Sequence, residues 1–252
     1  MKIQNYISSF SNVEAYDAST LNCFAFRHRY DVRQGLSLSL GNMVRGFGFD
    51  LQGIHFNNSE CAYIAGAFSD GTDAHLAIQR RLVACDNGFA AKKQIRKPHE
   101  SEKRADWEEF NVQWMLYCVW QKCKGNEDFR KLLLQIHQDV VLVENTTTDK
   151  WNSAEIWGCK NWDLVNKRAN LATVLMERHK DLSHKERKDL INIETNKIND
   201  IGEWKGQNNI GKILMICRDC LREGTAPTID YDLLNRANIY LFGERLTFNT
   251  DK

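Results

Sequence analysis

The chain has 252 residues, of which 42% are hydrophobic and 27% charged, and its formal net charge is +1. This length can bury a real core, and the near-neutral charge excludes the global basic field of non-specific DNA-binding proteins. The N-terminus lacks the apolar core of a signal peptide, and no stretch approaches the roughly 18 apolar residues of a membrane span, so we expect a cytoplasmic protein.

The chain contains few prolines and no sequence typical of a linker. Pro98 and Pro227 are the only prolines, and no Pro-rich or Gly/Ser-rich linker interrupts the sequence. We therefore expect residues 1–252 to form a single domain.

The first half of the chain predicts helices around one hairpin. Residues 1–25 are polar and predict a weak strand at most. Alternation around Gly53 predicts a hairpin over 47–57, and Asn or Ser in "NNSE" caps a helix over about 60–68. Further helices are predicted over 73–84 and 105–124, and the second is apolar around much of its circumference, which indicates a central, buried helix.

The second half continues the helical pattern. Beyond a helix in "NEDFRKLLLQIH", the sequence predicts a short buried strand over 139–145 and a final amphipathic helix in "NNIGKILMICRDCLRE". The charged segment 162–205 predicts two helices, and Ser183 with Glu186 forms a capping box for the second. The "ANIYLFGERLTF" stretch is strand-like. The predicted fold class is mainly α (α+β), with a few short strands and a long helical insertion.

Eight cysteines are present, and we expect them to be reduced in a chain without a signal peptide. Cys217 and Cys220 have metal-knuckle spacing, but no second C-x-x-C completes a zinc site, and the pair also fits one face of an amphipathic helix. We expect no metal and no cofactor.

Three places combine polar groups with expected burial. Glu60 heads an apolar helix, where an acid either interacts with the helix dipole or works in a pocket. Glu144 ends the apolar strand "VVLV", and Trp157-Gly158 predicts a tight turn that presents an indole face. A carboxylate beside an aromatic face suits a base or a sugar. The basic run 90–107 fits either a solvated helix end or a phosphate-binding wall.

Taken in order, ten short motifs resemble the NADAR family, the NAD- and ADP-ribose-associated hydrolases related to riboflavin-pathway N-glycosidases. They cover about four-fifths of a chain whose core spans about 27–223, leaving a tail at 224–252. The motifs are "LGNM" (40–43), "F...LQGIHFNNSE..Y" (49–63), "AAKK" (90–93), "RADW" (104–107), "NVQWM" (111–115), "QKC" (121–123), "F..LLL" (129–134), "LVENT" (142–146), "WGCKN" (157–161) and "NNIGKILMICRDCL" (208–221).

The resemblance implies cleavage of N-glycosidic bonds in ribose-containing nucleotides. One family branch acts on riboflavin-pathway ribosylaminopyrimidine phosphates. The other removes ADP-ribose from guanine in DNA, as antitoxin to an ADP-ribosyltransferase toxin, and its motifs resemble this chain more closely. The implied partners are ADP-ribosylated DNA or an ADP-ribose nucleotide and a cognate toxin, with no membrane. A non-catalytic ADP-ribose or NAD binder is the third hypothesis.

The resemblance also implies a site. Glu60 and Lys92 are the catalytic candidates, Glu60 acting on the ribose and Lys92 attacking its opened C1 as a Schiff base, although a surface role for Lys92 is equally compatible with the sequence. The diphosphate candidates are Arg27, Lys93, Arg104 and Arg218, with amides at Asn209 and Gly211. The remaining substrate candidates are Asn42, Ser59, Tyr63, Trp107, Glu144, Trp157 and Gly158.

Three features depart from the family pattern. The helix after Ser59-Glu60 continues as "YIAGAF", without the usual glutamine and basic residue. The acid expected before Trp157 is displaced, and Asp149 and Glu155 are both candidates. The 162–205 insertion is long, and DNA, the toxin or a second copy of the chain are its candidate partners.

Overall fold

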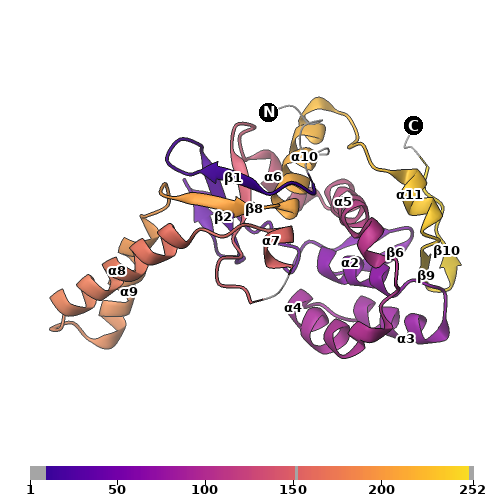
Figure 1. Ribbon diagram of the computed structural model, residues 1–252, viewed down its shortest axis with the longest axis horizontal. Helices are drawn as coiled ribbons and strands as arrows, with labels where there is room; N and C mark the ends of the chain where they lie inside the picture. Colours follow the sequence, from indigo (N-terminus) through magenta and orange to yellow (C-terminus); the bar gives the residue numbers. More distant parts are fainter. Residues whose placement is uncertain (1–9, 151–152, 250–252) are drawn as a thin grey trace. The chain divides into compact units, whose positions relative to one another are not determined.

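The computed structural model describes residues 10–150 and 153–249 (Figure 1). The backbone is mainly helical with short strands, which confirms the mainly α (α+β) prediction. The helical segments are α2 (Ser59–Ala67), α3 (Asp73–Val83), α4 (Gly88–Ala90), η1 (Ala91–Arg96), η2 (Lys97–Glu102), α5 (Trp107–Gly125), α6 (Glu127–Leu134), α7 (Ala154–Trp157), α8 (Trp162–Arg178), α9 (His184–Asn196), α10 (Asn209–Glu223) and α11 (Tyr231–Arg236). The strands are β1 (Glu14–Asp17), β2 (Cys23–Phe26), β3 (Val32–Arg33), β4 (Leu36–Ser37), β5 (Phe49–Leu51), β6 (Ile54–Phe56), β7 (Val141–Glu144), β8 (Glu203–Gly206), β9 (Tyr240–Leu241) and β10 (Glu244–Arg245).

Internal contacts divide the described chain into two compact units. The first unit contains residues 27–138 and 213–249, and the second contains residues 10–26 and 139–212. The expectation of one domain over the whole chain stays a prediction.

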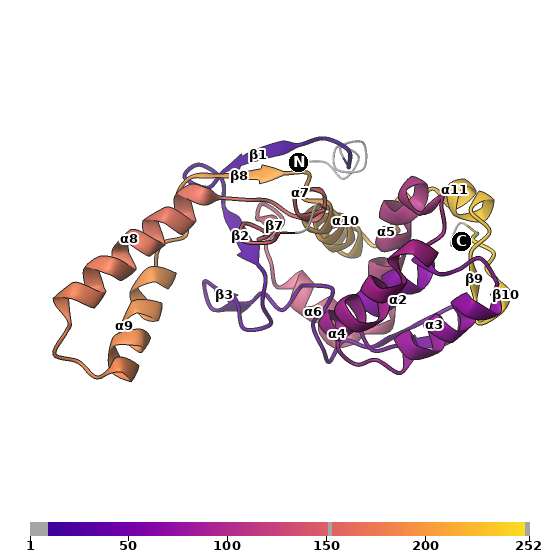
Figure 2. The ribbon, with the colours of Figure 1, turned by 60° about the horizontal axis from the view of Figure 1, so that its bottom comes forward.

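The first unit is built around α5, whose side chains are buried on most of its circumference, as its sequence predicts. Helix α2 lies beside α5 (Figure 2). Trp114 of α5 donates a hydrogen bond from Nε1 to the carbonyl of Ala62, at 3.2 Å. A Cβ at Gly66 would lie 2.3 Å from that same nitrogen. The small residues of "YIAGAF" therefore make room for an indole, which explains the apolar run after Glu60.

Local signals place the neighbouring elements of this unit. Strands β5 and β6 form the predicted hairpin, with Phe49 opposite Phe56 and a turn at Gln52 and Gly53, both of which have positive φ. Asn58 caps α2 by accepting a hydrogen bond from the Cys61 amide, as predicted. These confirmed features depend on residues close together in sequence.

The basic run is more ordered than a solvated helix end and loop. After an Asn87 cap, α4 leads into the π-helix η1 and then into the 3-10 helix η2. Single π turns are uncommon and occur often at functional sites.

The second unit pairs short strands that are distant in sequence. Strand β1 pairs antiparallel with β8, and β2 pairs parallel with β7. The prediction of at most a weak strand before residue 25 was therefore too cautious, because both N-terminal strands find their partners more than 100 residues away. The core beneath them consists of Tyr16, Ala18, Cys23, Val143, Cys159, Leu164 and Trp204.

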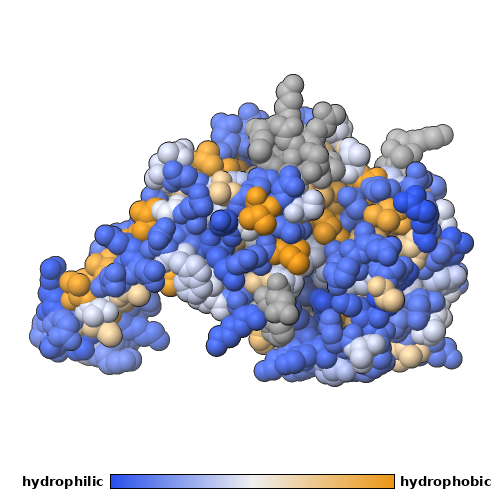
Figure 3. All heavy atoms as spheres, in the orientation of Figure 1, coloured by the Kyte–Doolittle hydropathy of each residue, from blue (hydrophilic) through white to orange (hydrophobic). Residues whose placement is uncertain are grey.

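The 162–205 insertion contains the two predicted helices, α8 and α9, followed by β8. Ser183 and Glu186 form the predicted capping box at the start of α9. None of the α9 residues is buried, and apolar side chains remain exposed along the α8–α9 hairpin (Figure 3). The largest of these are Trp162, Val174, Met176 and Ile193. Arg168 ties α8 to the Ile198 carbonyl, at 3.0 Å.

Among the described residues, no helix has the length and apolar character needed to cross a membrane. All eight cysteines are free in the structure.

Candidate active site

The Glu60 side chain lies in the first turn of α2 and is only 6% exposed. Its backbone amide donates to the carbonyl of Asn42, at 3.1 Å, so the 40–43 loop fixes the start of the helix. Asn42 is itself 7% exposed and accepts a hydrogen bond on Oδ1 from the Ser59 hydroxyl, at 3.2 Å. The structure thus brings together three of the predicted site residues, Asn42, Ser59 and Glu60, in the first unit.

Burial raises the pKa of the Glu60 carboxyl, while the positive charges of Lys92 and Arg96 lower it by a smaller amount. The net result is a carboxyl that holds its proton to higher pH than a solvated glutamate. An acid of this kind can protonate a leaving group and then act as a base. This electrostatic setting goes beyond helix-dipole stabilisation, for which a solvated carboxylate would suffice.

The π-helix η1 carries Lys92 and Arg96, the two cations that act on Glu60. Lys92 is half-buried, and the Arg96 side chain is 20% exposed and bonded to Glu100 at 3.3 Å. Close packing holds this segment beside α2, because a Cβ at Gly88 would lie 3.0 Å from the Cβ of Glu60. Lys93, in contrast, is exposed.

Tyr63 and Trp107 pack against each other, with ring centroids 4.9 Å apart. Trp107 is fully buried and also meets Phe110 edge-on. Burial raises the pKa of the Tyr63 hydroxyl well above its usual range, and Glu60 adds to the rise. Tyr63 therefore lies near Glu60, and its substrate role stays a prediction. The Trp107 indole has protein neighbours, whereas stacking on a substrate base would require open space.

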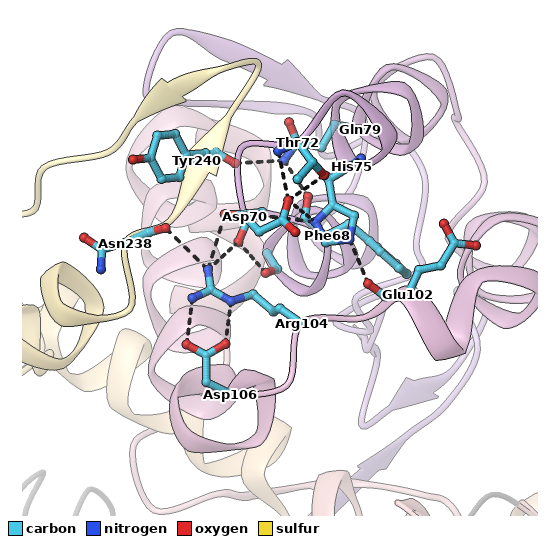
Figure 4. A network of polar contacts seen from close by, with 12 residues as sticks. Phe68, Asp70, Thr72, His75, Gln79, Glu102, Arg104, Asp106, Asn238 and Tyr240 are labelled. Atoms are coloured by element: carbon cyan, nitrogen blue, oxygen red, sulfur yellow. Dashed lines mark hydrogen bonds and ion pairs between the residues drawn. The ribbon is translucent and has the colours of Figure 1, made fainter.

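Arg104 lies in a network that joins α5, the 67–72 turn and the C-terminal hairpin (Figure 4). It forms a bidentate pair with Asp106, with Nε–Oδ1 and Nη2–Oδ2 distances of 2.6 and 2.7 Å. The same guanidinium donates to the Ser69 hydroxyl and to the carbonyls of Ala237 and Asn238. These bonds occupy the fork that was predicted to bind a diphosphate, and no support for that role follows from the geometry.

Arg218 likewise has protein groups as its bonding partners. Its side chain is fully buried, pairs with Asp219 at 2.8 Å, and donates to the carbonyls of His137 and Gln138. A diphosphate would have to displace these partners. Arg27 is half-buried at the start of a turn in which its amide bonds to Asp31, and its substrate role stays a prediction.

In the second unit, the backbone of Glu144 lies against Gly158 and Cys159. The Cys159 amide donates to the Glu144 carbonyl, at 2.8 Å, and a Cβ at Gly158 would lie 2.4 Å from that oxygen. The Trp157-Gly158 step is thus the end of the short helix α7 followed by extended backbone, where a tight turn was expected. Trp157 and Glu144 are both half-buried.

Asn208, the residue before α10, holds the end of β7. It accepts from the Glu144 amide at 3.2 Å and donates to the Leu142 carbonyl at 2.8 Å. A Cβ at Gly211 would lie 2.2 Å from the Leu142 carbonyl, so this glycine is explained by packing. The buried Asn209 Oδ1 has no hydrogen-bond partner within the described chain, and a ligand hydroxyl could supply one.

The two acids considered near Trp157 differ in their surroundings. Glu155 forms an ion pair with Lys160, at 2.8 Å, and its side chain is exposed. Asp149 is half-buried in the preceding loop. Neither is singled out as a site residue by this geometry.

Sequence reasoning missed two charged residues near Glu60. Arg96 is the third basic residue of the run that starts at Lys92, but nothing in the sequence indicates that a π-helix places it near Glu60. Lys122 is 1% exposed within α5, and its Nζ lies 3.3 Å from the Ser59 Oγ. A lysine in an apolar helix is the same signal that singled out Glu60, and it could have identified Lys122.

Cys217 and Cys220 are both buried in α10. Among residues 10–150 and 153–249, no group of three or more cysteine, histidine or acidic side chains could hold a metal ion.

Comparison with known proteins gives two findings. The NADAR domain model matches residues 41–222. The NMR structure of the E. coli protein YbiA matches with a TM-score of 0.50 and 19% sequence identity, covering 81% of this chain and 86% of that chain. At this identity the second match shows a shared fold alone. A search of curated proteins found no match.

Proposed function

The chain belongs to the NADAR domain family, and we propose from this premise that it hydrolyses the N-glycosidic bond between ADP-ribose and guanine in DNA. Membership points to N-glycosidase-like activity in general. The guanine-linked substrate is the finer proposal, and the motifs that resemble the antitoxin branch support it.

The observation that carries the proposal is the environment of Glu60. A buried carboxyl with a raised pKa, facing two cations, combines a proton donor with groups that favour an anionic substrate. Glycosidic bond cleavage needs a proton on the departing base and stabilisation of positive charge on the ribose. Glu60 supplies the proton, and its carboxylate then stabilises the sugar cation or activates water.

Lys92 is the proposed nucleophile for an opened ribose. In the opened adduct, C1 is joined to the guanine nitrogen as an imine, and attack of the Lys92 amine on C1 would form an aminal. The C1–N bond to guanine then breaks, with the guanine nitrogen taking a proton from Glu60, and leaves a Schiff base between C1 and Lys92. One water hydrolyses this Schiff base, which releases ADP-ribose and restores the amine. Arg96 lies on the same π-helix, and its positive charge also acts on Glu60.

The test is incubation with a DNA oligonucleotide that carries guanine-linked ADP-ribose, followed by mass spectrometry. Wild type should restore plain DNA and release ADP-ribose, and folded Glu60→Gln should bind without turnover. Borohydride reduction during turnover should trap ADP-ribose on the wild-type chain but not on Lys92→Ala, with Lys93→Ala as the matched control. Full activity of Lys92→Ala would eliminate the Schiff-base step.

Two other activities remain as outcomes of the same test. Intact adduct with hydrolysis of a ribosylaminopyrimidine phosphate would indicate the riboflavin-type reaction, which the near-neutral net charge favours. Intact substrates with a thermal shift on adding ADP-ribose would indicate a binding protein. The run after Glu60, which lacks the usual polar residues, is the feature that favours this last reading.

A further inference from the structure

Lys122 is a buried lysine without a carboxylate partner. It lies in α5 at 1% exposure, and no acidic side chain in the described chain comes within ion-pairing distance of its amine. Burying an ammonium group without a counter-ion is costly, so a lysine at this position calls for an explanation.

Two kinds of contact hold the Lys122 amine. Its Nζ lies 3.6 Å from the centroid of the Phe129 ring and 5.7 Å from that of Phe47, in cation–π geometry. Its polar contact is the donation to Ser59 Oγ, at 3.3 Å. The aromatic rings therefore stabilise the amine by cation–π contact, and the hydrogen bond to the Ser59 hydroxyl fixes its orientation.

Ser59 passes this constraint to the start of α2. Its hydroxyl accepts from Lys122 and donates to Asn42 Oδ1, at 3.2 Å. The Asn42 carbonyl in turn accepts from the Glu60 amide, at 3.1 Å. A continuous chain of hydrogen bonds thus runs from the core of α5 to the residue that bears the candidate catalytic carboxyl.

We propose that Lys122 is a positioning residue, whose amine orients Ser59 and, through Asn42, fixes the first turn of α2 so that Glu60 stays in its buried site. This inference deepens the proposed function, on which it rests for its catalytic meaning. Sites of this kind depend on supporting contacts that hold the reacting groups within a fraction of an ångström.

The direct test needs no substrate. In protein labelled with ¹³C at glutamate carboxyl carbons, NMR gives the titration midpoint of Glu60, assigned by its loss in Glu60→Gln. Lys122→Met keeps an unbranched apolar side chain, one atom shorter, and removes the amine. We expect its Glu60 midpoint to fall toward that of an exposed glutamate, because the loosened turn admits water.

Two further variants separate positioning from stability. Ser59→Ala removes the other end of the bond and should shift the Glu60 midpoint in the same direction; the double variant should shift it no further, since both changes break one chain. Phe129→Leu removes the ring under the amine and leaves the bond to Ser59. It should lower the unfolding temperature and leave the Glu60 midpoint in place.

Turnover gives the second readout. On the adducted oligonucleotide, Lys122→Met should lower kcat about tenfold and leave KM within about threefold, as expected for a misplaced reacting group. Unchanged Glu60 midpoints in both Lys122→Met and Ser59→Ala would overturn the inference, and Ser59→Ala alone decides it if Lys122→Met does not fold. Shifted midpoints with no turnover in wild type would instead refute the proposed function and leave the positioning role standing.

Discussion

Gly88 packs directly against the helix turn that bears Glu60. A Cβ at position 88 would lie 3.0 Å from the Glu60 Cβ and 2.7 Å from the Met43 Cα, closer than real side chains approach. The glycine therefore sets the separation between α4, which leads into the π-helix, and α2.

Gly88→Ala should push these elements apart. We expect a loss of about 1–3 kcal/mol in the free energy of unfolding, as for an overpacked core, and a larger fractional loss of turnover because η1 carries Lys92. Denaturant titration and single-turnover kinetics measure the two effects. Gly125→Ala is the matched control, since its added methyl would meet neighbours only at 3.5 Å or beyond. Equal effects of the two substitutions would contradict the role given to Gly88.

The raised pKa of Glu60 predicts a pH dependence of stability that can be measured without any substrate. Burial raises the folded-state pKa of this acid above its unfolded value of 4.5. Above pH 4.5 the folded chain therefore holds more protons on Glu60 than the unfolded chain does. The stability that protonated Glu60 contributes is fully present below pH 4.5 and is lost as pH rises through the folded pKa.

Glu60→Gln removes this dependence. The difference in unfolding free energy between Glu60→Gln and wild type should grow as pH rises above 4.5, in favour of the variant. Urea titrations at several pH values measure it. Exposed Glu127, paired with Lys131 at 2.7 Å, serves as the control, and Glu127→Gln should show no such growth. Parallel pH curves for wild type and Glu60→Gln would show that Glu60 ionises as freely in the folded state as in the unfolded one.

Lys122 predicts a dependence of opposite sign. Burial lowers its pKa to about 7 in the folded state, against 10.5 unfolded, although the nearby thiols of Cys123 and Cys217 oppose the shift. Between these values the unfolded chain holds the extra proton, so stability rises with pH from about 7 to about 10.5. The stability that the neutral Lys122 amine contributes is present above pH 10.5 and has been lost once pH has fallen through 7.

Lys122→Met should flatten the rise above pH 7 and be more stable than wild type near neutral pH, because it removes a desolvated charge. The difference should be on the order of a few kcal/mol and shrink as pH approaches 10.5. Lys131→Met, which alters an exposed lysine, should leave the slope unchanged. A wild-type stability that is flat across this window would show that the amine stays protonated in the fold.

The sequence predicted those parts of the fold that depend on residues close together in the chain. The Asn58 cap, the β5–β6 turn and the Ser183–Glu186 capping box are local, and all three were predicted correctly. Strands β1 and β2 pair with partners far along the chain, so their own composition gave little sign of them. Local chemistry predicts elements, and distant pairing does not follow from it.

The same distinction applies to the site. Glu60 was recognisable because an acid in an apolar run needs a reason, and its burial agrees with that argument. The sequence could not separate phosphate-binding arginines from structural ones, because a guanidinium binds a phosphate and a set of backbone carbonyls equally well. Arg104 and Arg218 bind carbonyls and carboxylates of the fold, whereas Arg96, which acts on Glu60, was not among the candidates.

Arg104 predicts a stability effect that tests this assignment. Its fork joins Asp106 to Ser69 and to the carbonyl of Ala237, and the pairing holds the pKa of Asp106 below its usual range. Lysine carries the charge but lacks the planar fork, so Arg104→Lys should lose about 1–3 kcal/mol of unfolding free energy. Arg45→Lys, at the exposed pair with Asp86, should change it by less than about 0.5 kcal/mol.

Ligand affinity distinguishes the structural from the binding role of Arg104. If the network of Figure 4 is the whole function of Arg104, folded Arg104→Lys should bind ADP-ribose as wild type does. Amide hydrogen exchange should become faster at β9 and β10, because Arg104 contacts the carbonyls of Ala237 and Asn238 just before β9. A strong loss of ADP-ribose affinity with unchanged exchange would instead return Arg104 to the phosphate-binding role that its sequence context first indicated.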